Sequence, residues 1–278
     1  MNEAKQQILT GERALYQSRN LKVVDCVFED GESPLKESSD IEVLGSIFKW
    51  RYPLWYCKNV TIKDSDFFEG CRAGMWYTQH MFLENSIIKS PKNFRLCKDL
   101  TLKNVQFTDG PETLWKCSQV RLENVYAKGD YFAMDCSHMD IENFNLDGKY
   151  SFDGVKNVTI RNARMLTKDA FWNSENVTVY DSFISAEYLG WNAKNLTFVN
   201  CTIESLQGLC YVENLVLKNC KLINTTLAFE YSTVDVHVVS SINSVKNPSG
   251  GIIRCASIGE LIMEKDKVDV SKTKFETL

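Results

Sequence analysis

The residues with the greatest chemical potential are tryptophans that recur at one place in a regular spacing, with charged side chains among them. Five of the 6 tryptophans share this place, and a tyrosine lies close to the same series. Aromatic rings stack on the apolar faces of sugars, while charged groups orient hydroxyls or carboxylates. The pattern predicts a surface that binds an oligosaccharide or a sugar acid. The predicted ligand-binding residues are Trp55, Trp76, Trp115, Tyr131, Trp172 and Trp191.

Acidic side chains in the same series raise the question of catalysis. Asp135 and Asp153 occupy neighbouring repeats, one place out of phase, so a carboxyl separation of about 5–6 Å is expected. Two carboxylates at that spacing can serve as a paired acid and base in glycoside chemistry. The sequence leaves open whether the chain is an enzyme. The weak catalytic candidates are Asp130, Asp135, Asp153, Asp169, Arg72 and Lys168.

An aromatic band also has non-catalytic interpretations. Tryptophans repeated at one phase can stack and stiffen the fold, and contiguous apolar surface usually has a partner. The alternative hypothesis is therefore a non-enzymatic scaffold or protein-interaction protein that could form a homodimer.

These residues are positioned by a repeat of 19 to 21 residues that runs along almost the whole chain. Each copy reads polar, apolar, any, apolar, any, then Asn or Asp, with another apolar residue three further on. A weaker copy lies near Asp235, and a clear one returns at Glu260 with Leu261, Met263 and Val268. Alternation with a period of two indicates a strand with one buried face. The eleven regular copies begin at Asn20, Asp40, Asn59, His80, Asp99, Gln119, His138, Asn157, Asn176, Asn195 and Asn214.

Each copy is too small to fold alone, so stacked copies must bury a continuous core. We predict an all-β, single-stranded, right-handed parallel β-helix of about 13 coils, roughly 60 Å long. It is expected to form a single domain over residues 1–278. Residues 1–15 would be an N-terminal cap, residues 16–268 the coils and residues 269–278 a polar tail. Two other repeat folds are excluded. A leucine-rich repeat places two residues between its last strand apolar residue and the Asn, where this chain has one. A pentapeptide repeat needs a bulky apolar residue at every fifth position, which this chain does not keep.

Two rows of the repeat are predicted to be structural. The Asn and Asp residues five places after each start, such as Asn85, Asn104 and Asn124, suit a left-handed corner, and stacked amides can bond to one another. Cys57, Cys97, Cys117 and Cys136 share another place, where small inward residues would fill the core. His80 and His138 are expected to be turn residues.

Composition excludes several classes of protein. A net charge of −4 gives a nucleic-acid partner no electrostatic support. No apolar run reaches the length of a membrane span, and the N-terminus lacks a signal-peptide core. We therefore expect a cytoplasmic protein with free thiols. With 10 cysteines but no C-x-x-C pair and 3 histidines, we expect no metal and no cofactor.

The coil NVTIKDSDF (59–67) resembles those of the pectin-lyase-like β-helices, which include polygalacturonases, pectate lyases and epimerases. Over essentially the whole chain, the sequence is more similar to an uncharacterised bacterial family of cytoplasmic β-helix proteins, catalogued as a domain of unknown function. This resemblance implies the fold and no site residues. The stretches that carry it are WRYPLWYCKNV, KGDYFAMDCS, KDAFWNSENVTVYDS and EYLGWNAKNLTFVNCTIESLQGLCY.

Overall fold

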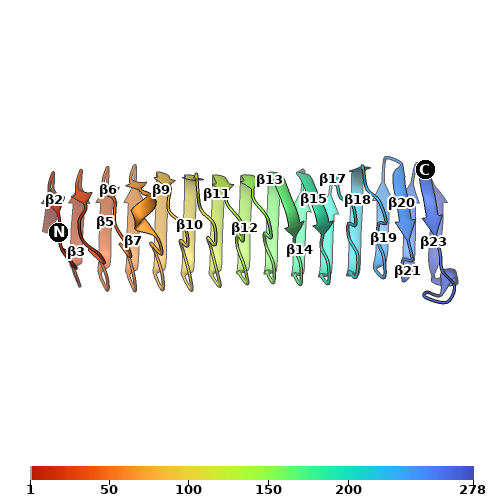
Figure 1. The fold of residues 1–278 in the computed structure, drawn as a ribbon, viewed down its shortest axis with the longest axis horizontal. Coiled ribbons are helices and arrows are strands. Elements are labelled where there is room, and N and C mark those ends of the chain that lie inside the picture. Colours follow the sequence, from red (N-terminus) through yellow and green to blue (C-terminus); the bar gives the residue numbers. More distant parts are fainter. Residues whose placement is uncertain (1) are drawn as a thin grey trace. The chain divides into compact units, whose positions relative to one another are not determined.

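Successive strands lie on one another in parallel register in the computed structural model, which describes residues 2–278 (Figure 1). The chain divides into two compact units, one ending at Phe144 and the other spanning Asn145–Leu278. Each unit is a right-handed parallel β-helix, as the repeat predicts. Among residues 2–278, no helix is long and apolar enough to cross a membrane.

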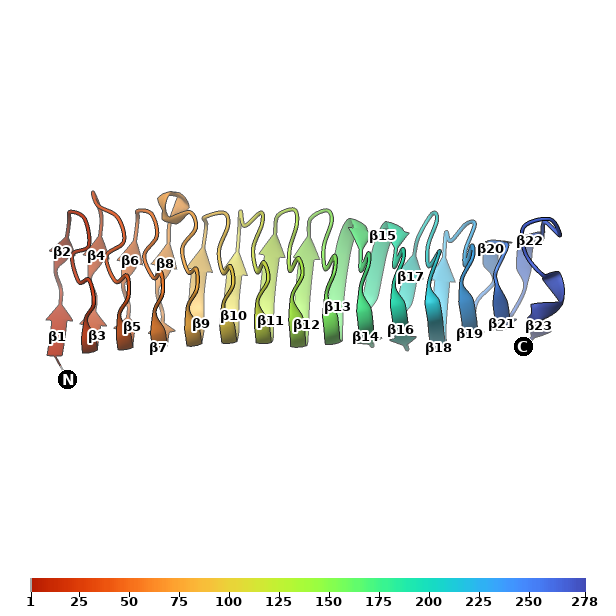
Figure 2. The same cartoon turned by 90° about the horizontal axis from the view of Figure 1, so that it is seen from below.

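The first unit contains short strands in its early coils and longer strands from residue 79 onward (Figure 2). Its strands are β1 (Asn2–Lys5), β2 (Ile8–Leu9), β3 (Arg19–Val24), β4 (Val27–Phe28), β5 (Ser39–Leu44), β6 (Ile47–Phe48), β7 (Lys58–Lys63), β8 (Asp66–Phe67), β9 (Gln79–Ile88), β10 (Lys98–Phe107) and β11 (Ser118–Lys128). A short 3-10 helix, η1 (Glu69–Cys71), follows β8, and β12 (Ser137–Asp147) spans the boundary between the units.

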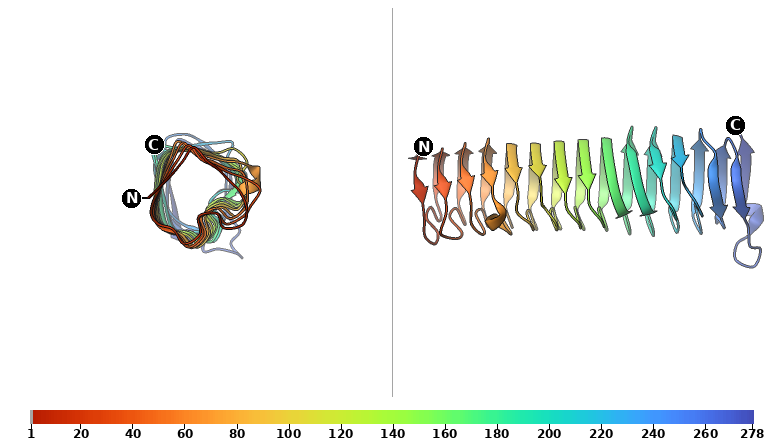
Figure 3. Two further views of the ribbon diagram at one scale, coloured as in Figure 1. Left: turned by 90° about the vertical axis from the view of Figure 1, so that its left-hand side faces the viewer. Right: turned by 45° about the horizontal axis from the view of Figure 1, so that its top comes forward.

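The second unit continues the same alternation of strands and corners, which Figure 3 shows from two further directions. It ends with a second 3-10 helix, η2 (Val270–Lys272). Its strands are β13 (Lys156–Ala170), β14 (Glu175–Tyr180), β15 (Phe183–Leu189), β16 (Lys194–Val199), β17 (Thr202–Glu204), β18 (Glu213–Ile223), β19 (Thr233–Val238), β20 (Ile242–Lys246), β21 (Gly250–Cys255), β22 (Ile258–Ile262) and β23 (Thr273–Thr277).

The strand register confirms the predicted stacking of one repeat on the next. Val60 pairs with Met81, and Met81 pairs with Leu100, so residues one repeat apart are direct neighbours. In the second unit Val158, Val177 and Leu196 follow one another in the same way. All of these side chains are buried. The inward face of each strand therefore forms a continuous apolar row.

Aromatic side chains fill the core of the first coils. The rings of Phe28, Phe48 and Phe67 stack with centroid distances of 4.6 and 4.8 Å and interplanar angles of 4° and 3°. Parallel register brings identical side chains to this spacing without adjustment, because strand neighbours lie about 4.8 Å apart. Phe48, the middle ring, therefore buries both of its faces against the rings of Phe28 and Phe67.

The Asn row five places after each start forms the predicted ladder of amides. Asn104 Nδ2 donates to Asn85 Oδ1 at 2.9 Å, and Asn124 Nδ2 donates to Asn104 Oδ1 at 3.0 Å. These residues have φ near +50°, the left-handed conformation that Asn tolerates. A second ladder at the repeat starts was not predicted; in it Asn195 Nδ2 donates to Asn176 Oδ1 at 2.8 Å.

All 10 cysteines are buried and free, which confirms their expected place in the core. Cys97 and Cys136 donate their thiols to the carbonyl oxygens of Met75 and Leu114, each at 2.9 Å. Burial raises the pKa of Cys57 to about 12, so this thiol stays protonated and unreactive at neutral pH.

The ends of the chain add coils that the repeat did not reveal. Strand β1 pairs with β3 and strand β23 pairs with β21, so the terminal residues continue the parallel sheet. The expected repeat start at Glu260 is wrong: β22 pairs with β20, which is a second strand of its coil, and Leu261 is 45% exposed. At this coil the first strand carries Gly251, where a Cβ would lie 1.8 Å from the Val234 carbonyl oxygen.

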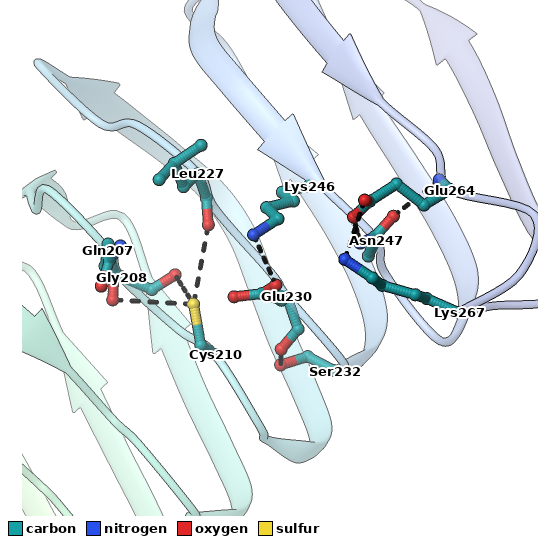
Figure 4. A network of polar contacts seen from close by, with 10 residues as sticks. All are labelled: Gln207, Gly208, Cys210, Leu227, Glu230, Ser232, Lys246, Asn247, Glu264 and Lys267. Atoms are coloured by element: carbon teal, nitrogen blue, oxygen red, sulfur yellow. Dashed lines mark hydrogen bonds and ion pairs between the residues drawn. The ribbon is translucent and has the colours of Figure 1, made fainter.

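A polar network supports these irregular C-terminal coils (Figure 4). Lys246 Nζ lies 2.9 Å from Glu230 Oε1, and Lys267 Nζ lies 2.8 Å from Glu264 Oε1. Asn247 Nδ2 donates to Glu264 Oε2 at 2.6 Å. The contacts of Lys246 with Glu230 and of Asn247 with Glu264 join neighbouring coils where the apolar repeat is weakest, whereas the Lys267–Glu264 pair lies within one segment.

We expect Asn104→Ala to lower the free energy of unfolding by about 2 kcal/mol. The variant loses two hydrogen bonds of the ladder, and alanine has no side-chain amide to offset the strain of a positive φ. Asn104→Gly should cost less, since glycine accepts this φ without strain. Thermal unfolding of the two variants measures the difference. Equal midpoints for wild type and Asn104→Ala would show that the ladder contributes nothing.

Candidate functional site

In the first unit, the predicted tryptophans form a stack that we call the tryptophan ladder, made of Trp55, Trp76, Arg95 and Trp115. The rings of Trp55 and Trp76 are 5.1 Å apart at an angle of 6°. The Arg95 guanidinium carbon lies 4.5 Å from the ring centroids of both Trp76 and Trp115. A planar cation therefore occupies the place of one ring, which is a favourable arrangement for arginine between aromatic faces.

The indole N–H groups of the tryptophans donate to backbone carbonyls further along the chain. Trp76 Nε1 donates to the Lys92 oxygen at 2.8 Å, and Trp115 Nε1 donates to the Tyr131 oxygen at 2.8 Å. Trp55, Trp172 and Trp191 donate to the oxygens of Ala73, Tyr188 and Gln207 in the same manner. The five indoles are consequently held half-buried.

A sugar that stacks on a tryptophan, as the predicted binding surface requires, needs an open ring face. Both faces of Trp76 are covered, one by Trp55 and the other by Arg95. The physical reason is the parallel register, which places side chains of the same row within stacking distance. At Trp76 the ladder therefore offers a ligand the ring edge rather than a ring face.

The second unit contains a small recess of about 20 Å³ that we call the aspartate pocket. Trp172 forms part of its wall, and one face of this ring stacks on Trp191 at 5.5 Å and 10°. Pairing of Ser151 with Ala170 places Asp153 beside the other face. The Asp153 side chain is too short to cover an indole, so part of the ring borders the recess. The lining residues are Tyr150, Ser151, Asp153, Asp169, Ala170 and Trp172.

Asp169 enters the pocket because the inward and outward alternation of β13 breaks at its end. Asp169, Ala170 and Phe171 are all buried in succession, and Phe171 has φ of 59° as the chain turns the corner. The Asp169 residue is only 6% exposed, and its Oδ1 atom has no hydrogen-bond partner. The Oγ atom of Ser151, which is 1% exposed, also lacks a partner. A buried acceptor and a buried hydroxyl therefore meet at one recess.

The electrostatic surroundings of Asp169 favour its protonated form. Burial raises the pKa of this carboxyl, Lys168 lowers it, and the negative charges of Glu187 and Asp153 raise it further. Lys168 has its Nζ 6.0 Å from the Tyr188 ring centroid. Asp153 differs from Asp169, because it is half-buried and its Oδ1 accepts a bond from Asn173 Nδ2 at 2.9 Å.

The pocket brings together three of the predicted site residues, Asp153, Asp169 and Trp172, with Lys168 next to them in the chain. Arg72, Asp130, Asp135 and Tyr131 belong to the first unit. There Tyr131 and Asp130 use their carbonyl oxygens to accept from Trp115 Nε1 and the Glu112 N–H. The expected pairing of Asp135 with Asp153 joins residues of different units and stays a prediction.

Sequence reasoning missed Ser151 and the pocket-lining role of Tyr150. The available signal was a break in two rows: Asp153 stands where Trp172 and Trp191 stand in later repeats, and Asp169 stands between Tyr150 and Tyr188. Replacing a ring with a short acid leaves space in a stacked row. Chemically, the resulting recess can bind a hydroxyl or amino group, and a carboxyl with a raised pKa is suited to donate a proton.

Replacing Asp169 with a neutral residue should show how much its buried carboxyl lowers the stability of the fold at neutral pH. Because the Asp169 pKa is raised in the folded state, its carboxyl favours folding below the unfolded pKa and loses that contribution as pH rises through the folded pKa. We expect Asp169→Asn to unfold at a higher temperature than wild type at pH 7, with the gain disappearing near pH 4. Thermal melts across this range measure it, and a lower midpoint at every pH would contradict it.

The tryptophan ladder gives a second test. Arg95→Met keeps the length of the side chain but removes two cation–π contacts, so we expect a loss of about 1–2 kcal/mol in the free energy of unfolding. The near-ultraviolet circular dichroism of the stacked indoles should change as well. Arg72→Met, at an exposed site, is the control. Identical spectra and midpoints in the two variants would argue against a stabilising ladder.

No curated protein matches the chain. Among solved structures, the A-module of the mannuronan C-5 epimerase AlgE6 of Azotobacter vinelandii is 13% identical, with a TM-score of 0.42 and 94% of this chain and 89% of that chain covered. The adhesin PfbA of Streptococcus pneumoniae is 8% identical, with a TM-score of 0.36 and 93% and 82% covered. The tailspike protein of E. coli bacteriophage HK620 is 10% identical, with a TM-score of 0.37 and 92% and 61% covered.

Similarity at this level carries no assignment of activity. A family model, described as protein of unknown function (DUF3737), matches residues 2–276. Because this match covers nearly the full length, the chain belongs to the DUF3737 family.

Proposed function

We propose that the chain is a carbohydrate-binding protein and that the aspartate pocket of its second unit holds one group of the saccharide. The observation that supports this most is the pair of buried, unpartnered atoms, Asp169 Oδ1 and Ser151 Oγ. A sugar hydroxyl both donates and accepts hydrogen bonds, so it can satisfy the carboxyl and the serine at once. Leaving both unsatisfied costs about 1–3 kcal/mol for each group, and a bound ligand relieves that cost.

The aromatic wall of the pocket suits the rest of a sugar ring. One face of Trp172 is packed on Trp191, while the side next to Asp153 borders the recess. Trp172 is also held in place by its bond to the Tyr188 oxygen at 3.0 Å. A fixed ring costs little entropy when a ligand stacks on it, which favours binding.

The size of the recess indicates how much of a ligand it contains. At about 20 Å³ it is far smaller than the 300–1,000 Å³ range of sites that enclose a whole small molecule. It therefore takes one group of a sugar, with the remainder on the surface. In the first unit, Trp76 could contact a saccharide only through its ring edges, because both of its faces are covered. In the second unit, Trp191 already covers one face of Trp172.

If the protein also turns over its ligand, the pocket offers a defined pair of groups. Asp169 is suited to be a proton donor, because burial favours its protonated form. Asp153 would be the second carboxyl, positioned by Asn173. Substitution of either residue is informative about catalysis only after turnover has been observed.

Tryptophan fluorescence titrated with a panel of neutral, amino and acidic oligosaccharides tests the proposal. We expect at least one saccharide to change the emission of the wild type with a saturable curve. Trp172→Ala should weaken that binding by at least tenfold, since both the ring and its contact with the pocket are lost.

Trp76→Ala is the matched control, because Trp76 has the same place in its coil and the same indole bond but both faces covered. It should bind like the wild type. A flat response to the whole panel would reject carbohydrate binding. If light scattering then showed a stable dimer, the interaction hypothesis would replace it. Equal losses in Trp76→Ala and Trp172→Ala would remove the pocket from the site.

A further inference from the structure

The charges around the aspartate pocket are predominantly negative. Asp153 and Asp169 line it, and Glu187 is close enough to act electrostatically on Asp169. Among the described residues of the second unit, the ion pairs include neither Asp153 nor Asp169. The one cation acting on Asp169 is Lys168, whose Nζ lies 6.0 Å from the Tyr188 ring centroid. The pocket thus holds carboxyl groups without a paired cation of its own.

The polar atoms of the pocket are mainly acceptors. Asp169 Oδ1 is unpartnered, Asp153 has a carboxyl oxygen beyond the one that accepts from Asn173, and Ser151 Oγ can accept through its lone pairs. A hydroxyl has a single hydrogen to donate, whereas an ammonium group has three and accepts none. The set of acceptors therefore matches an ammonium group better than a hydroxyl.

The aromatic wall favours the same chemistry. A cation near the face of tryptophan is attracted by the ring quadrupole, and the attraction strengthens when the site is desolvated. Trp172 supplies that ring, and Tyr150 lies on the same recess. An aromatic wall with three acceptors disfavours a bare metal ion, and no cluster of three or more metal-binding side chains occurs among residues 2–278.

We infer that the aspartate pocket binds the protonated amino group of an amino sugar, so that the ligand is a saccharide containing unacetylated hexosamine. This inference rests on the proposed carbohydrate-binding function. It also narrows the ligand, because a uronic carboxylate would meet the like charges of Asp153 and Glu187. Of the ligands expected from the sequence, the sugar acid is thereby disfavoured.

Isothermal titration calorimetry with four trimers tests this inference: glucosamine, N-acetylglucosamine, glucose and galacturonic acid. At pH 6.5 and low salt, we expect the glucosamine trimer to bind at least tenfold more tightly than the acetylated and neutral trimers, and the galacturonate trimer to bind weakest. Asp169→Asn should reduce the preference for glucosamine to less than threefold. Asp181→Asn, an exposed acid of the same unit, should preserve it.

The outcomes separate the two proposals. Binding of the neutral or acetylated trimer as tight as that of the glucosamine trimer overturns the inference while carbohydrate binding stands. Binding of n-butylamine as tight as that of the glucosamine trimer also overturns it, because the sugar ring would then contribute nothing. Failure of all four trimers to bind rejects both proposals. A preference that survives Asp169→Asn and disappears in Asp181→Asn would place the amine elsewhere.

Discussion

Parallel pairing in register is the constraint on which the rest of this structure depends. Val60, Met81 and Leu100 are direct strand neighbours, so residues at each of the remaining positions of the repeat must also stack on one another. At the spacing of about 4.8 Å between strands, aromatic rings can stack on one another and side-chain amides can form hydrogen bonds. Stacked phenylalanines, the Asn ladders and the tryptophan ladder are therefore consequences of one geometric condition applied to different side chains.

The same condition explains why a pocket exists where it does. In a filled row each side chain covers the face of its neighbour, as Trp55 and Arg95 do for Trp76. A cavity can open only where a row changes from a large residue to a small one. Asp153 makes that change beside Trp172, and Asp169 makes it between Tyr150 and Tyr188. Two neighbouring rows are interrupted in adjacent coils, and the two gaps meet in one recess.

Most of the fold could be predicted from the sequence, because the repeat reports the register directly. The strands, the amide ladder and the buried cysteines follow from which residue types share a place. The site was harder to predict. Row membership indicates which tryptophans are neighbours, yet it does not reveal that their N–H groups are bonded to backbone or that their faces are covered. The prediction of the C-terminal coils was wrong for a related reason. Gly251 has no apolar side chain, so the apolar pattern could not be recognised at its strand, and the repeat was assigned to the segment of Leu261 instead.

The composition of the pocket is unfavourable for the stability of the fold. At the place of Asp169 the neighbouring coils carry Tyr150 and Tyr188, so the fold accommodates a ring there. Aspartate at this position lowers stability in two ways. It cannot stack on the neighbouring rings, and it leaves a buried oxygen without a hydrogen-bond partner. Ser151 adds a second unsatisfied group to the same recess. Departures from local consistency that have no structural compensation are expected at functional sites, and here two of them share one recess beside Trp172.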